Sequence, residues 1–271
     1  MNLQHRVAVL TGAGGGIGRA TAQALARRGC HIALVDVDPE GLRQTAGLVA
    51  LSGVRVSGHV LDIASRTQVA ELPALVMAAH GQVDILINNA GVALGGTFEQ
   101  TSEADFDWLM EINFHGVVRM TRAFLPLLRE RDAARIVNVS SLFGLVSPPG
   151  QTAYSASKFA VRGFSNALRH ELEGSVVGVT VVHPGGIATS IARNARLPAS
   201  AASIATSDIE KRVRQAEKML RMPAEKAGEI IVKGIERERP RVLVGLDAKI
   251  VSLLERLMPV HYWRLLGRGM P

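Results

Sequence analysis

Short β-branched runs alternate along this chain with longer segments whose apolar residues recur at helical spacing. The predicted strands are Arg6–Leu10, His31–Asp36, Val54–His59, Asp84–Asn88, Arg135–Ser140, Val177–His183 and Arg241–Val244. The predicted helices are Ile17–Arg28, Glu40–Leu51, Arg66–His80, Glu103–Glu130, Thr152–Glu173 and Glu225–Glu236. Strands separated by helices imply parallel pairing through crossovers. The pattern therefore predicts an α/β, Rossmann-like, doubly wound domain with a seven-stranded parallel sheet and helices on both faces.

Two segments depart from the alternation, although no linker divides the chain, which we expect to be one domain over residues 1–271. Residues 186–222 show no strand pattern, and 208–221 have the pattern of a polar helix. We expect a substrate loop or lid here, with a surface excursion of no functional role as the alternative. Residues 246–271 form an amphipathic tail with basic residues around an apolar stripe. It is expected to pack on the domain or a second subunit, or to contact an anionic membrane surface.

The amino-acid composition and the charge distribution limit the kinds of core, partner and location that this protein is expected to have. Hydrophobic residues make up 47% of 271 residues but aromatic residues only 4%, so the core must consist mainly of Ala, Val, Ile and Leu. The formal charge is +7, yet arginines are scattered from Arg6 to Arg268 without a basic, aromatic-interleaved run. We therefore expect no nucleic-acid partner, and a basic surface suited to an anionic cofactor. The N-terminus lacks a signal-peptide pattern and no segment approaches a transmembrane span, so the expected location is the cytoplasm.

Metal chemistry has little support in the sequence. Cys30 is the only cysteine, which excludes an intramolecular disulfide and a cysteine cluster. His170 and Glu171 lack the second histidine of a helical zinc site, so no metal is expected.

A glycine-rich turn follows the first predicted strand and opens a helix. Glycine permits a tight turn there, and it lets backbone N–H groups approach a pyrophosphate without interference from a Cβ atom. The positive end of the helix dipole favours the same anion. The predicted cofactor-binding residues of this turn are Gly12, Gly14, Gly16, Ile17 and Gly18.

Asp36 ends the second predicted strand, eighteen residues beyond Gly18. A carboxylate at this point accepts hydrogen bonds from the adenosine ribose hydroxyls of NAD and repels the 2′-phosphate of NADP. The following residue is Val37, which offers no charge to offset that repulsion. NAD is therefore the expected cofactor. The alternative is a turn acid that precedes Asp38-Pro39.

The chain resembles the short-chain dehydrogenase/reductase family in its compact single-domain form, from Arg6 to about Gly245. The resemblance rests on an ordered set of motifs: TGAGGGIG at 11–18, Asp62, NNAG at 88–91, Asn113, Ser141, YSASK at 154–158, and Pro184-Gly185 followed by Thr189. It implies a redox enzyme with a catalytic set of Asn113, Ser141, Tyr154 and Lys158. By the same resemblance, Asn113 holds a water that links Lys158 to solvent, and Lys158 also binds the nicotinamide ribose.

Tyr154 and Lys158 lie four residues apart on a predicted helix and therefore share one face. A tyrosine with its ordinary pKa of about 10 transfers protons poorly at neutral pH. A nearby ammonium favours the phenolate, so we expect Lys158 to lower the pKa of Tyr154. Ser141 lies thirteen residues before Tyr154 and is placed to bind the reacting oxygen; no GxSxG elbow surrounds it, which disfavours a nucleophilic serine. Asn113 lies inside a predicted helix, where an irregularity would suit its role.

The resemblance also predicts cofactor contacts beyond the glycine turn. Asp62 and Ile63 are expected at the adenine, Asn88 beside the adenosine ribose, and Ala90 and Gly91 at a close approach of the cofactor. Asn89 is open between a site role and a structural one. Pro184, Gly185, Ile187 and Thr189 are expected around the nicotinamide, although Pro184 and Gly185 also fit a plain turn.

The predicted substrate-binding residues are Ser141, Phe143, Val146 and Tyr154. The apolar residues in this set predict a lipophilic secondary alcohol or ketone, although Arg193 and Arg196 in the excursion are able to recognise an acidic group. The predicted function is hydride transfer between NAD(H) and such a substrate. The alternatives are a cofactor-sensing regulator without catalysis, or a membrane-surface protein that keeps the fold. By resemblance, the helix at 152–173 pairs with its symmetry mate, so a homodimer or homotetramer is expected.

Overall fold

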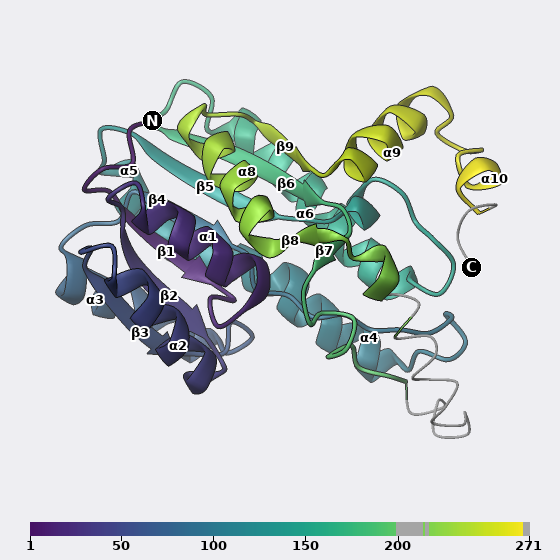
Figure 1. Cartoon of the computed structure of the whole chain (residues 1–271), viewed down its shortest axis with the longest axis horizontal. Coiled ribbons are helices and arrows are strands. Elements are labelled where there is room, and N and C mark those ends of the chain that lie inside the picture. The colour runs from purple at the N-terminus through teal and green to yellow at the C-terminus, as the bar shows by residue number, and fades with distance from the viewer. Residues whose placement is uncertain (199–213, 215–216, 268–271) are drawn as a thin grey trace.

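Seven parallel strands form one sheet, in the order β3-β2-β1-β4-β5-β6-β9, in the computed structural model, which describes residues 1–198, 214 and 217–267 (Figure 1). The strands are β1 (Val7–Thr11), β2 (His31–Asp36), β3 (Val56–Val60), β4 (Ile85–Asn88), β5 (Ala134–Val139), β6 (Val177–Pro184) and β9 (Arg241–Val244). The strand order reverses between β1 and β4, and ligands of such sheets bind at the carboxyl ends of the strands beside this reversal. The predicted fold class is confirmed.

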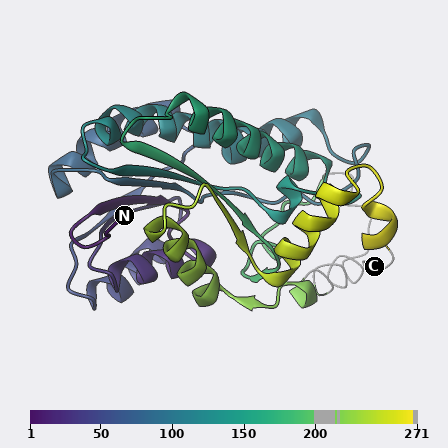
Figure 2. The same ribbon diagram turned by 90° about the horizontal axis from the view of Figure 1, so that it is seen from above.

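Helices cover both faces of the sheet (Figure 2). The helices and helical turns are α1 (Gly16–Ala26), α2 (Pro39–Ala50), α3 (Arg66–His80), α4 (Glu103–Met110), the π-helix η1 (Glu111–His115), α5 (Gly116–Arg129), the 3₁₀ turn η2 (Leu142–Gly144), α6 (Thr152–Glu171), α8 (Ala224–Glu236), α9 (Leu246–Leu257) and α10 (Trp263–Leu266). One apolar cluster joins the sheet to α1, α2 and α8, and a second joins it to α3, α5 and α6. Strand residues alternate between them: Ala8 and Leu10 belong to the first cluster and Val9 to the second.

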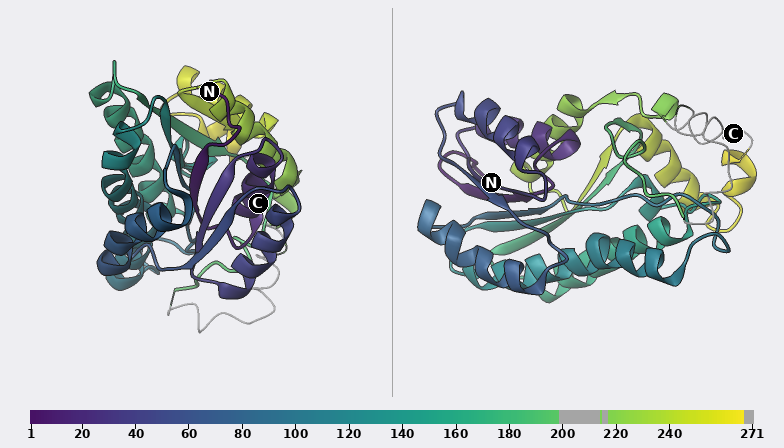
Figure 3. Two further views of the ribbon diagram at one scale, coloured as in Figure 1. Left: turned by 90° about the vertical axis from the view of Figure 1, so that its left-hand side faces the viewer. Right: turned by 90° about the horizontal axis from the view of Figure 1, so that it is seen from below.

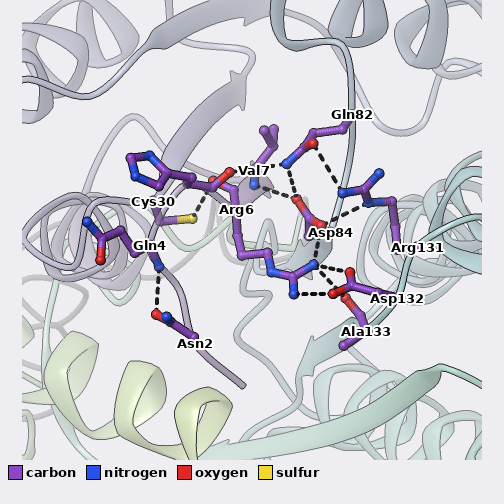
Figure 4. Close-up of polar contacts among 11 residues, drawn as sticks. Asn2, Gln4, Arg6, Val7, Cys30, Gln82, Asp84, Arg131, Asp132 and Ala133 are labelled. Carbon is purple, nitrogen blue, oxygen red and sulfur yellow. Dashed lines mark hydrogen bonds and ion pairs between the residues drawn. The ribbon is translucent and has the colours of Figure 1, made fainter.

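The amino-terminal edge of the sheet is held by a buried carboxylate, far along the strands from the glycine turn. The Asp84 side chain has no exposed surface. Its oxygens accept hydrogen bonds from the Val7 N–H at 2.8 Å, Gln82 Nε2 at 2.9 Å, and the guanidinium groups of Arg6 and Arg131, each at 2.9 Å (Figure 4). Because every oxygen is paired, the charge is tolerated inside the protein.

Most predicted elements lie within two residues of the observed ones. The long predicted helix 103–130 is divided into α4, η1 and α5, and the irregularity expected near Asn113 is the π-helix η1. A π-helix leaves backbone groups to find partners outside the regular ladder, and such bulges occur often at functional sites.

The excursion after β6 contains two short strands that its sequence did not indicate. β7 (Ile187–Ala188) and β8 (Met222–Pro223) pair in parallel and bring the two ends of the excursion together. The polar helix predicted at 208–221 falls mostly outside the described residues. In the tail, α9 ends at Leu257, and Pro259 follows two residues later, where its ring would interrupt a helix. The helices of the tail, drawn in yellow, lie at one end of the molecule (Figure 3).

Candidate active site

The turn between β1 and α1 has the backbone of an anion cradle. Gly12 and Gly16 have φ values of +66° and +50°, which favour glycine. A Cβ atom at Gly12 would lie 2.7 Å from the Ala90 Cα atom, too close for any side chain. At the start of α1, Gly15 supplies no side-chain cap and the first turn has no acid, whereas a side chain caps each of α2, α3 and α4. The first N–H groups of α1 are therefore left for an anion, which fits the pyrophosphate of a dinucleotide.

Asp36 lies against this turn at the carboxyl end of β2. Its Oδ2 atom accepts a hydrogen bond from the Gly14 N–H at 2.7 Å, and its Oδ1 atom accepts one from the Asp38 N–H at 3.0 Å. Arg19, which follows the glycine turn directly, donates to the carbonyl of Gly14 and to Thr45 Oγ1. Arg19 therefore joins the turn to α2, and its guanidinium is committed to that contact.

Thr11 and Asn89 fix the glycine turn to the end of β4. The Thr11 hydroxyl accepts hydrogen bonds from the N–H groups of Asn89 and Ala90, both at 3.0 Å. Asn89 Nδ2 donates to the carbonyl oxygens of Thr11 at 2.9 Å and of Gly12 at 3.1 Å. For Asn89, the sequence left open a role in the site and a structural role. These hydrogen bonds show the structural role, because the side chain fixes the glycine turn. Thr11 was not identified from the sequence, because a threonine at a strand end carries no distinguishing pattern.

The side chain of Asn88 does not reach this turn. It is only 2% exposed, and its amide donates to Asn138 Oδ1 at 2.8 Å and to Thr121 Oγ1 at 3.2 Å. The prediction that Asn88 lies beside the adenosine ribose is therefore left to its backbone, because its side chain is engaged in the core. Neighbouring residues of a strand point to opposite faces, and the side chain of Asn88 points between β5 and α5.

The π-helix aims Asn113 at the end of β4. Its Oδ1 atom accepts from the Val92 N–H at 2.8 Å, and its Nδ2 atom donates to the Val92 carbonyl at 3.0 Å and to Ser157 Oγ at 3.2 Å. A Cβ atom at Gly91 would lie 3.2 Å from both Asn113 Oδ1 and Lys158 Nζ. The side chains of Asn113 and Lys158 therefore lie close together beside Gly91. A water held by Asn113 and linked to Lys158, as the family resemblance implies, would need this proximity. Ser157, which joins Asn113 to the carbonyl of Tyr154, was missed from the sequence.

Tyr154, Lys158 and Ser141 gather above the ends of β5 and α6. Lys158 Nζ lies 5.7 Å from the centre of the Tyr154 ring and donates to the Val139 carbonyl at 3.2 Å. Ser141 follows β5, and its hydroxyl accepts from the Phe143 N–H at 3.1 Å. The hydroxyls of Ser141 and Tyr154 are hydrogen-bonding neighbours. The predicted trio of side chains is thus brought together.

The electrostatics of the trio differ from the sequence-based expectation. Burial raises the pKa of Tyr154, and the hydrogen bond with Ser141 offsets that rise only in part. Burial also lowers the pKa of Lys158 to about 8. The expectation of a lowered pKa for Tyr154 was wrong for this arrangement, because desolvation of the phenolate is the largest effect on its pKa. Tyr154 accordingly keeps its proton at neutral pH.

His183 positions the backbone of Ser141 and was not identified from the sequence. Its Nδ1 atom lies 3.0 Å from the Ser141 carbonyl oxygen, and its ring is fully buried. Burial lowers the pKa of His183 to about 4, so the ring is neutral at neutral pH. Since a carbonyl only accepts, Nδ1 carries the proton of the neutral ring in this pair.

The segment after β6 passes close to the glycine turn. The Thr189 Cγ2 atom would be 3.1 Å from a Cβ atom at Gly16, which places Thr189 beside the start of α1. The Gly185 N–H donates to the Val244 carbonyl at 2.9 Å, and Ile187 is buried. At the other side, the exposed carboxylate of Asp62 accepts from the Ala64 N–H at 2.9 Å.

The predicted substrate-binding residues divide into two groups. Phe143 is half-buried and meets the Tyr154 ring edge-on, with ring centres 6.1 Å apart. Val146 is fully buried, so the structure does not place it on an accessible surface. In the excursion, Arg193 pairs with Glu217 and Arg196 pairs with Asp105, the latter at 3.2 Å.

Two further features of the described residues concern other kinds of site. They contain no group of three His, Cys, Asp or Glu side chains able to hold a metal ion. None of the helices they form is long and apolar enough to cross a membrane.

Comparison with known proteins agrees with this geometry. The family model described as short chain dehydrogenase matches residues 6–199. The chain therefore belongs to the short-chain dehydrogenase/reductase family, and it is an NAD(P)-dependent oxidoreductase that acts on CH–OH and carbonyl groups.

Particular relatives extend the likeness over the whole chain. The sequence is 42% identical over 274 residues to the oxidoreductase SadH of Mycobacterium tuberculosis, a protein whose own assignment is provisional. The match covers 99% of this chain and 96% of that protein. It is 34% identical over 192 residues to 3-ketodihydrosphingosine reductase of Bacteroides thetaiotaomicron, covering 71% and 68% of the two chains. A short-chain dehydrogenase/reductase from Burkholderia phymatum in complex with NAD is similar in structure, with a TM-score of 0.86, 32% identity and 95% of each chain covered. Other similar structures of the family hold NAD or NADP.

Proposed function

We propose that this enzyme transfers a hydride between NAD(H) and a lipophilic secondary alcohol or ketone, with Tyr154 as the acid and base. The observation that carries the proposal is the convergence of Ser141, Tyr154 and Lys158 with Asn113 at Gly91. A proton donor, a second hydroxyl and a buried cation there surround one position for a reacting oxygen.

The proposed reaction follows from the protonation states of Tyr154 and Lys158 and from the hydroxyl of Ser141. In the reducing direction, Ser141 donates a hydrogen bond to the carbonyl oxygen, and Tyr154 transfers its proton to that oxygen. NADH, when bound, would supply the hydride that the carbonyl carbon gains and would leave as NAD⁺, so that the ketone becomes an alcohol. The Tyr154 phenolate left behind is stabilised by the ammonium of Lys158. Asn113 orders the path from Lys158 to solvent by holding the backbone of Val92.

NAD as the preferred cofactor rests on Asp36. Its carboxylate lies within hydrogen-bonding distance of the Gly14 N–H, where the adenosine ribose hydroxyls of NAD are expected to compete for it. A 2′-phosphate there would face this charge, while Arg19 is engaged with the turn and α2. The NAD complex of the Burkholderia phymatum relative supports the choice.

The proposed cofactor site extends along the carboxyl edge of the sheet. It comprises Gly12, Gly14, Gly16, Ile17, Gly18, Asp36, Asp62, Ile63, Asn88 through its backbone, Ala90, Gly91, Tyr154, Lys158, Pro184, Gly185, Ile187 and Thr189. Residues 186–222 are proposed as a substrate lid on a single domain of residues 1–271. The outer face of α6, where Phe159 is exposed, is proposed as the contact of a homodimer or homotetramer.

A lipophilic substrate fits the surroundings of Tyr154. Phe143 packs edge-on against the Tyr154 ring, and the two arginines of the excursion, Arg193 and Arg196, already pair with acids of this chain. The likeness to a reductase named for a ketodihydrosphingosine supports a substrate with an apolar chain.

The test is a screen of alkyl and cyclic alcohols and ketones with NAD(H) and NADP(H), run with wild type and Tyr154→Phe. We expect turnover of apolar substrates with NAD(H), and loss of about a thousandfold or more in kcat for Tyr154→Phe. Activity that survives unchanged in this variant would refute the role of Tyr154. If cofactor binds by calorimetry while no substrate of either class is turned over, the cofactor-sensing regulator is the better account.

A further inference from the structure

Helix α9 carries an apolar stripe that faces away from the domain. Leu246, Ile250, Leu253 and Leu257 follow one another at spacings of four, three and four residues, which places them on one face of a helix. They are between 56% and 72% exposed. The opposite face, with Val251 at its centre, is buried against the domain. The buried face therefore packs α9 against the domain, and the apolar stripe makes no part of that contact.

Two further exposed apolar side chains follow α9 in the chain. Val260 is 77% exposed, and Leu265 on α10 is 48% exposed. The turn between the two helices is tied to the domain, because the Tyr262 hydroxyl accepts a hydrogen bond from the Ser147 N–H at 3.1 Å. We call the six residues Leu246, Ile250, Leu253, Leu257, Val260 and Leu265 the tail face. Exposed apolar residues that recur on one face of a helix anchored to the domain are typical of a surface with a partner.

Exposed cations border the tail face, and the acids of the same segment point elsewhere. Lys249 and Arg256 lie seven residues apart on one side of the stripe, and Arg264 lies on α10. The Asp247 carboxylate is turned toward the domain, where it accepts from the Gly186 N–H at 2.7 Å. Glu255 is half-buried and interacts with Arg241. Over residues 246–267, the charge beside the tail face is thus positive.

We propose that the tail face docks on the surface of an anionic lipid bilayer. Apolar side chains flanked by Lys and Arg are the composition of helices that lie in the plane of a membrane, with the apolar face among the acyl chains and the cations at the headgroups. A second copy is a poorer occupant, because antiparallel pairing of two α9 helices would bring the same cations to one seam.

Docking in this way would place the rim of the candidate active site at the lipid surface. α9 follows β9 at the carboxyl edge of the sheet, and α9 and α10 lie together at that end of the molecule (Figures 1 and 2). Asp247 holds Gly186, which follows the Pro184-Gly185 pair, and Tyr262 holds the loop between Ser141 and Tyr154. The inference goes beyond the proposed function and stands independently of the substrate.

The experiment is co-sedimentation of the full chain with phosphatidylcholine vesicles, with and without phosphatidylglycerol. One variant removes the stripe and keeps the cations: Ile250→Ser, Leu253→Ser and Leu257→Ser together. A second keeps the stripe and removes the cations: Lys249→Gln, Arg256→Gln and Arg264→Gln. The matched control is Leu51→Ser, which removes an apolar side chain that is 85% exposed at the end of α2. The near-UV circular dichroism spectrum verifies that each variant is folded.

We expect wild type and Leu51→Ser to sediment with the anionic vesicles, and each tail variant to bind them at least about tenfold more weakly. Neutral vesicles should bind wild type weakly. Failure of wild type to sediment with anionic vesicles overturns the proposal. So does equal binding by a folded stripe variant, and a fall in its mass by light scattering would then identify the tail face as a contact between subunits.

Discussion

The ring of His183 holds the backbone of Ser141, with Nδ1 3.0 Å from the Ser141 carbonyl oxygen. His183 lies on β6 and Ser141 follows the end of β5, so the contact joins two neighbouring strands at the residue whose hydroxyl adjoins Tyr154. We predict that His183→Ala lowers kcat by about tenfold or more, because a small shift of Ser141 misplaces the hydroxyl that binds the substrate oxygen. The KM for NAD should change little.

Steady-state kinetics check this prediction, with His183→Asn as the conservative variant, since its amide retains a donor. Val182→Ala, a loss of volume in the same buried strand, is the matched control. If all three variants lose thermal stability alike and kcat does not move, His183 is only a core residue.

Acid stability gives a second measure of His183. Burial lowers its pKa in the folded state to about 4, against an ordinary value of 6.5. As pH falls below about 6.5, the unfolded chain takes up the proton first, so the stability contributed by this residue is present at neutral pH and is lost between about pH 6.5 and 4. A depression of this size corresponds to about 3 kcal/mol.

Urea unfolding at pH 7 and at pH 4.5 measures the effect. The free energy of unfolding should fall less with acidification in His183→Gln than in wild type. Parallel pH profiles for the two proteins would contradict the assignment.

Asp36 should set the choice between cofactors. Removing its carboxylate in Asp36→Ser relieves repulsion of the 2′-phosphate and removes the acceptor for the ribose hydroxyls of NAD. We expect the ratio of kcat/KM for NAD to that for NADP to fall by about a hundredfold. The control is Asp38→Ser, which alters the cap of α2 two residues away. An unchanged ratio in Asp36→Ser would show that another residue selects the cofactor.

The raised pKa of Tyr154 predicts different pH profiles for the two directions of the reaction. Burial is the main cause, so Tyr154 is protonated at neutral pH and becomes a phenolate only under alkaline conditions. Carbonyl reduction, which needs the proton, should be supported at neutral pH and decline as pH rises. Alcohol oxidation, which needs the phenolate, should increase in that range. Profiles of kcat/KM in both directions test this, and an oxidation rate that falls with rising pH would argue against the assignment.

The sequence predicts the sheet and the approximate site well, because both depend on local patterns. Strand runs, the glycine turn and the Tyr154–Lys158 spacing each lie within a few neighbouring residues. The neighbours Asn88 and Asn89 show what local patterns do not predict. The side chain of Asn88 enters the core, whereas that of Asn89 binds the glycine turn. This difference depends on which face of the sheet each residue points to, and not on residue type. The pKa of Tyr154 was misjudged for a related reason, since its burial depends on elements distant in the sequence.

Asp84 offers a test of the fold that is separate from the chemistry. Its side chain is buried and accepts hydrogen bonds from Arg6, Arg131, Gln82 and the Val7 N–H at the amino-terminal edge of the sheet. Asp84→Ala leaves these donors without their acceptor, so we expect the free energy of unfolding to fall by about 3–5 kcal/mol.

The matched control is Asp132→Ala. Asp132 also pairs with Arg6, but its side chain is 71% exposed, so water replaces the lost partner and the effect should be much smaller. Urea unfolding at neutral pH measures both variants, and the KM for NAD in folded Asp84→Ala should match wild type because the site lies at the opposite edge of the sheet. Equal destabilisation by the two substitutions would mean that burial of Asp84 does not govern the strength of this network.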